Sequence, residues 1–192
     1  YKLHRGQKSE GIYLEKAIDS LSKAKNIIIK NPEPDNKSNK EIEALPDKMV
    51  ALVHFGRSGT GLMHSLIDGH PEVSTLPSVY LSEYFAHSTW EKIIGGGWSA
   101  MVDRFMTIYD VLFDASSAIP IETKSKKLIH NIGQMEGMTN VGNRRDEVLK
   151  VDKTKFRSEL QRLIDCYDDL DPFIFFKLAS VAYDNTIKEL NK

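Results

Sequence analysis

The most informative part of the sequence lies between residues 49 and 76, which run MVALVHFGRSGTGLMHSLIDGHPEVSTL. The apolar run Met49–Phe55 predicts a short buried strand of a parallel sheet, bounded by Pro46 on one side and Gly56 on the other. Apolar residues at helical spacing follow over Leu62–Ile67 and predict a short helix. The expected order is therefore a strand, a glycine-rich turn and a helix.

The turn itself, Gly56–Gly61, has the composition of an anion-binding loop. Its glycines let the backbone approach an anion closely, and the N-terminus of the following helix adds partial positive charge. Arg57 supplies a guanidinium that can donate two hydrogen bonds, while Ser58 and Thr60 supply hydroxyl donors. These features predict a nest for a phosphate group; a plain tight turn is the alternative.

Two positions separate this loop from that of nucleoside-triphosphate hydrolases. The hydrolase pattern places Lys and then Ser or Thr after its second glycine. Here Leu62 and Met63 occupy those positions. Mg²⁺ requires hard oxygen ligands, which a Met thioether cannot supply. The loop is therefore expected to hold a phosphate without a metal ion.

The segment Arg57-Ser-Gly-Thr60 resembles the 5′-phosphosulfate loop of the P-loop sulfotransferases, which use 3′-phosphoadenosine 5′-phosphosulfate (PAPS) as donor. The similarity covers Val50–Leu76, including His70-Pro71 before an expected second strand at Glu72–Leu76. Phe113–Ser117 and the helical remainder are also similar to microbial sulfotransferase-domain proteins.

The resemblance implies an α/β fold, with a three-layer parallel sheet of the P-loop NTPase type that is rich in helices. It implies transfer of a sulfuryl group from PAPS to a hydroxyl or amine of a small-molecule, glycan or peptide acceptor. PAP is the other product, and no metal is required. Arg57 would also stabilise charge on the transferring group, as phosphoryl transfer requires. The residues implied to bind the donor are Gly56, Arg57, Ser58, Gly59, Thr60 and Gly61.

Two features of the family pattern are not matched. The family grips the donor's 3′-phosphate with an Arg and a Ser at a later strand, and Arg144-Arg145 has no apolar strand before it. We expect this element to lie beyond Lys192, so that Tyr1 and Lys192 are cut ends. The parallel sheet would then be incomplete, and this chain alone would be inactive. The second unmatched feature is the general base. Glu83 is the nearest carboxylate after the second expected strand, and His87 is the alternative base. Glu83 could also be an exposed helix carboxylate without a catalytic role.

Composition excludes several other classes of protein. The 192 residues include 26 Lys and Arg against 27 Asp and Glu, so the chain lacks the basic field of a nucleic-acid-binding protein. No apolar stretch approaches the length of a membrane helix. The single cysteine, Cys166, excludes an internal disulfide, and we expect a reducing, cytoplasmic location.

The chain is expected to comprise a helical arm over 1–30, a Pro-containing linker over 31–48 and the sulfotransferase-like domain over 49–192. Within that domain Trp98–Phe113 is expected to form a helix. Asp152 is predicted to cap a further helix. Asp171-Pro172 has the pattern of a helix start, so Phe173–Phe176 is not assigned to a strand.

Two other functions remain open at this point. The chain could be a kinase or NTPase with a degenerate P-loop. It could also be a non-catalytic module that binds nucleotide or a protein partner and retains only an anion nest.

Overall fold

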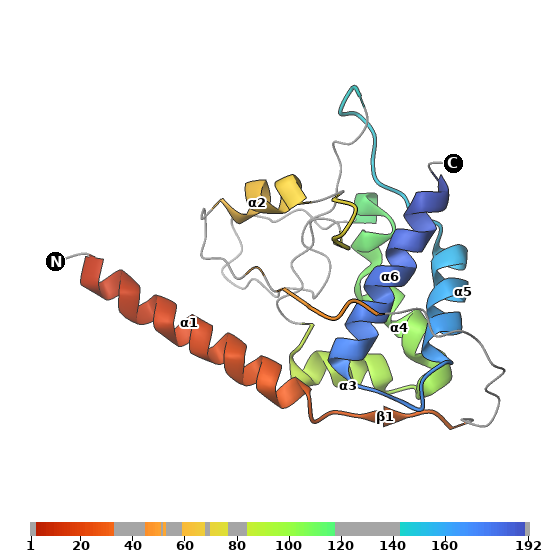
Figure 1. Ribbon diagram of the computed structural model, residues 1–192, viewed down its shortest axis with the longest axis horizontal. Helices are drawn as coiled ribbons and strands as arrows, with labels where there is room; N and C mark the ends of the chain where they lie inside the picture. The colour runs from red at the N-terminus through yellow and green to blue at the C-terminus, as the bar shows by residue number, and fades with distance from the viewer. Residues whose placement is uncertain are drawn as a thin grey trace.

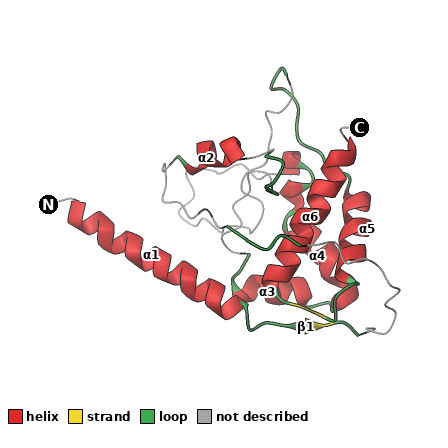
Figure 2. Cartoon of the chain, in the orientation of Figure 1, coloured by secondary structure: helices red, strands yellow, loops and turns green. Residues whose placement is uncertain are grey.

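The structure is a computed structural model in which helices dominate (Figure 2). It describes residues 3–32, 45–50, 52, 59–67, 70–76, 84–117 and 143–190. The α-helices are α1 (Leu3–Ala24), α2 (Thr60–Ile67), α3 (His87–Ile94), α4 (Met101–Ile108), α5 (Lys153–Ile164) and α6 (Pro172–Leu190). Three short 3-10 helices are η2 (Trp98–Ala100), η3 (Asp110–Leu112) and η4 (Ala115–Ser117).

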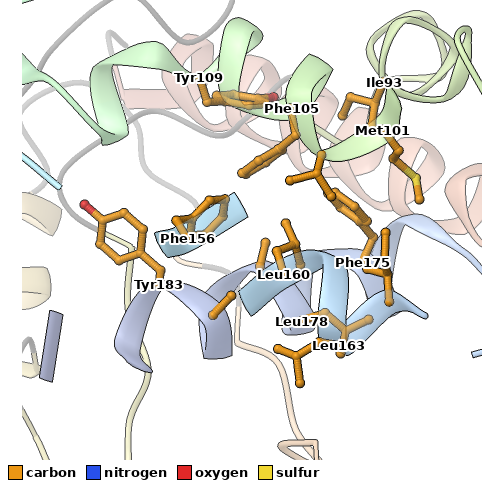
Figure 3. Close-up of a cluster of buried hydrophobic side chains, with 14 of the residues drawn as sticks. Ile93, Met101, Phe105, Tyr109, Phe156, Leu160, Leu163, Phe175, Leu178 and Tyr183 are labelled. Atoms are coloured by element: carbon orange, nitrogen blue, oxygen red, sulfur yellow. The ribbon is translucent and has the colours of Figure 1, made fainter. Parts of the chain in front are cut away.

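Helices α3 to α6 form a helical body around one apolar core. Within it, α5 and α6 lie side by side (Figure 1). Aromatic rings join the helices: Phe105 of α4 stacks on Phe156 of α5 with 6.2 Å between ring centroids, and Phe156 meets Tyr183 of α6 edge to face at 6.2 Å (Figure 3). Tyr109 and Trp90 are also fully buried. These aromatic side chains therefore serve packing of the core.

Both capped helix starts are confirmed. The carboxylate of Asp152 accepts hydrogen bonds from the amides of Thr154 and Lys155, which lie in the first turn of α5. Asp171 does the same for Phe173 and Ile174 at the start of α6. In each case an acidic side chain satisfies amides that have no partner within the helix.

The N-terminal arm leaves the helical body as a single long helix (Figure 1). α1 runs from Leu3 to Ala24, within the expected arm, and Ala24 at its end is buried. After it, β1 (Ile29–Lys30) pairs with β2 (Asp169–Leu170) in antiparallel register, with Ile29 opposite Leu170. This pair ties the chain just after α1 to the segment that links α5 and α6.

The predicted α/β fold is wrong for the residues that the structure describes. Their one sheet is the two-stranded antiparallel pair of β1 and β2, and they contain no parallel three-layer sheet. The expected second strand, Glu72–Leu76, is not a strand, nor are residues 49, 50 and 52 of the expected first strand. The rest of that first strand lies outside the described ranges.

The expected strands differ from the observed structure because of their backbone partners and not because of their amino-acid composition. An apolar run becomes a strand only when neighbouring backbone satisfies its amides and carbonyls. Val50, which the pattern placed in a buried strand, is 82% exposed. Ser74 instead directs its hydroxyl to α6, and Leu76 inserts into the helical core. The core is thus closed by helices, and these segments pass over it without forming a sheet.

The expected helix over Trp98–Phe113 is broken into three pieces. η2 starts after Gly97, whose φ of 78° and ψ of −175° are open to glycine almost alone. α4 then ends at Ile108, Tyr109 caps it, and η3 continues as a tighter turn. The apolar stripe still faces the core, because Met101, Phe105 and Leu112 are all fully buried.

Candidate functional site

The described part of the anion-loop motif begins at Gly59, directly before α2. Gly59 has a φ of 77°, and a β-carbon placed on it would have no atom within 4 Å. Its carbonyl oxygen accepts a hydrogen bond from the amide of Met63 at 3.0 Å, so Gly59 caps the helix. Amides in the first turn of a helix have no partner within it, and they carry the positive end of the helix dipole.

Part of the predicted site lies outside the described residues. Gly56, Arg57 and Ser58 are in this group, and so is Glu83, the predicted base. Thr60 and Gly61 are described as the first two residues of α2. The structure therefore places the helical half of the predicted loop, and the predicted roles of Arg57 and Glu83 stay predictions.

Helix α2 exposes apolar side chains instead of burying them. Leu62 is 69% exposed, Met63 51% and Leu66 73%. Leu62 and Met63 occupy the two positions that Lys and a Mg²⁺-binding hydroxyl hold in nucleotide hydrolases. Exposed side chains contribute little burial free energy. Ile67, at the end of the helix, is half-buried. The segments at its two ends therefore contribute to the position of α2.

A tight turn follows α2 and redirects the chain toward the body. The amide of Val73 donates to the carbonyl of His70 at 3.0 Å across Pro71, and proline is favoured at that position of a turn. The His70 Nδ1 atom accepts a hydrogen bond from the Glu72 amide at 3.2 Å. His70 thus stabilises the turn through its side chain.

Both segments that flank α2 are bound to one stretch of α6. On the side before the loop, Lys177 Nζ donates to the backbone oxygen of Asp47 at 3.3 Å. On the side after it, Ser74 Oγ donates to the backbone oxygen of Ser180 at 3.3 Å. Residues three apart on a helix lie on the same side of it. One turn of α6 therefore contacts both ends of the segment that carries the motif.

The chain enters the body again at Tyr84, the residue after Glu83. The Tyr84 hydroxyl donates to the backbone oxygen of Pro172, at the start of α6, at 2.9 Å. Burial raises the pKa of Tyr84 well above its ordinary value, and the nearby Tyr109 and Asp171 add to the effect. Tyr84 therefore remains a neutral hydrogen-bond donor. His87, the alternative base, is exposed on α3, and its Nε2 lies 3.2 Å from Glu91 Oε1.

Sequence reasoning did not find Lys177, Ser74 or Tyr84 as residues that hold the site. Their hydrogen bonds join positions 130, 106 and 88 residues apart. Side-chain spacing along the chain contains no signal for such contacts.

The described ranges hold no group of three or more His, Cys, Asp or Glu side chains that could bind a metal ion. Within the same ranges, no helix has both the length and the apolar character that crossing a bilayer requires. Comparisons with protein-family models, with curated proteins and with solved structures gave no match. The function of the chain has to be argued from its own residues.

Proposed function

We propose that the loop Gly56–Gly61 binds the 5′-phosphosulfate of PAPS and that the chain serves sulfuryl transfer to a hydroxyl or amine acceptor. The observation that carries the proposal is the left-handed Gly59 directly before α2. A residue of positive φ beside right-handed helical residues directs successive amides toward one point, where an anion can bind. The sequence supplies Arg57 and Ser58 on the other side of that point.

In the proposed reaction the bond between sulfur and the 5′-phosphate oxygen breaks, and a bond forms between sulfur and the acceptor oxygen or nitrogen. The acceptor's proton passes to a base, for which we propose Glu83, with His87 as the alternative. Arg57 and the amides of the loop stabilise negative charge on the sulfuryl group and on the departing phosphate. Holding donor and acceptor in line is the other contribution of such a site. We propose a cytoplasmic location, with which a single cysteine, Cys166, is compatible.

The test is calorimetry of Arg57→Ala with 3′,5′-adenosine bisphosphate and with adenosine 5′-phosphosulfate. The variant is expected to lose measurable binding of both, because it removes the one cationic side chain of the loop. Arg144→Ala is the matched control, since Arg144 is an exposed arginine outside the loop. Unchanged affinity in Arg57→Ala would overturn the proposal. A gain in ATP affinity on adding Mg²⁺ would favour a kinase or NTPase instead.

A non-catalytic interaction module is the second candidate. It is favoured by the exposed Leu62, Met63 and Leu66 on α2, which are available to a partner. The two functions differ in one measurement, which is transfer of radiolabelled sulfate from PAPS to a panel of hydroxyl and amine acceptors. Nucleotide binding without any transfer would favour the interaction module.

A further inference from the structure

We propose that the turn of α6 containing Lys177 and Ser180 is a positioning element for the anion loop. It does not touch the anion. It holds the two ends of the segment that carries the loop, and through them it sets where the loop lies. The inference rests on the proposed function for its ligand, whereas the positioning itself can be tested without any ligand.

Helix α2 is held only in part by its own packing. Three of its apolar side chains, Leu62, Met63 and Leu66, are each more than half exposed, and Ile67 is half-buried. A short helix in water gains little stability from its own hydrogen bonds and depends on packing for the rest. The connections of this eight-residue helix to the body therefore contribute to its position.

The segments before and after the loop both contact α6. Leu45 packs partly against the core and Leu76 is buried in it. Two hydrogen bonds accompany these apolar contacts. Lys177 donates to the backbone oxygen of Asp47, and Ser74 donates to that of Ser180. Segments on either side of the loop are therefore brought to one place, which limits the directions that the loop can take.

The two residues of α6 act through different atoms. Lys177 acts through its side chain, which reaches a backbone oxygen that other donors could also satisfy. Ser180 acts through its backbone oxygen, while its own hydroxyl donates back to Phe176. The informative substitutions are therefore Lys177→Met and Ser74→Ala. Each removes one donor, and the Met side chain keeps most of the apolar stem of the lysine.

The experiment has two parts. In the ligand-free protein, hydrogen exchange is measured for the amides of residues 59–67 and for those of α5. We expect faster exchange in α2 for Lys177→Met and Ser74→Ala, with α5 unchanged, because loss of either contact frees one end of the segment. Lys92→Met, at an exposed lysine of α3, is the matched control, and Lys177→Arg is expected to restore wild-type exchange.

In the second part, affinity for adenosine 5′-phosphosulfate is expected to fall about three- to ten-fold in each variant, the range expected for one lost hydrogen bond. If wild type binds this probe and both variants bind it equally well, the positioning inference is overturned while the proposed function stands. If wild type does not bind, the proposed function fails, and the exchange measurement alone decides the inference. Exchange in α2 that matches the Lys92→Met control overturns it.

Discussion

Substitution of Gly59 by Ala tests the anion nest at the residue where its geometry is observed. The added methyl group would have no atom within 4 Å, so the effect comes from the backbone torsion and not from a clash. A left-handed conformation costs an L-residue about 1–2 kcal/mol. That free energy corresponds to a factor of about 5–30 in an equilibrium constant.

We expect this penalty to appear in binding rather than in global stability. Gly59 precedes a helix whose side chains are mostly exposed, so the loop can relax to negative φ while the body stays folded. A ligand that needs the left-handed conformation must then restore it, and its apparent affinity falls by the same factor. Calorimetry with adenosine 5′-phosphosulfate should give a dissociation constant raised about 5- to 30-fold. Gly59→Asn should lose less, since Asn tolerates this conformation.

Gly97→Ala is the matched control. Gly97 has a φ of 78°, and a β-carbon there would also meet no atom within 4 Å. It lies inside the helical body between α3 and η2, where its amide donates to Ile94. We expect about 1–3 kcal/mol of lost stability from the strained backbone, a lower Tm and unchanged affinity. The reasoning is refuted if Gly59→Ala binds like wild type, or if Gly97→Ala weakens binding as much.

Three further predictions concern the helical body. Asp152→Ala should destabilise the fold by about 0.5–2 kcal/mol in urea unfolding, because the first amides of α5 lose their acceptor; no change would mean that water replaces the cap fully. Leu160→Ala should cost about 2–5 kcal/mol, since the fully buried side chain would leave a cavity in the core; a smaller loss would indicate that the core closes around it. Glu159→Gln should destabilise by about 1 kcal/mol at neutral pH, allowing for the partial exposure of its partner. Hydrogen bonding from Arg162, and secondarily from Asn185, lowers the pKa of Glu159 below its ordinary 4.5. Its contribution is therefore complete above that value and is lost as the pH falls through the lowered pKa; a wild-type-to-variant difference that persists in acid would contradict this origin.

Local signals in the sequence predicted the helical body well. Asp152 and Asp171 were recognised as caps because a cap involves residues two or three positions apart, and the structure confirms both. The buried stripe from Met101 to Leu112 was likewise visible from apolar spacing alone. The helix of residues 60–67 was expected from the same spacing, and the left-handed Gly59 fits the role given to that glycine.

The sequence by itself determined the caps and the apolar stripes, because each depends on residues close together in the chain. Only the tertiary structure decided whether Glu72–Leu76 would be a strand, since a strand exists through a neighbour that no local pattern names. In this chain Ser74 instead donates a hydrogen bond to α6, and Leu76 packs into the helical core. Tertiary structure likewise decided that Lys177, more than a hundred residues beyond Asp47, would hold the segment leading to the loop. Contacts at that separation depend on how the helices pack, so they emerge only when the whole body has folded.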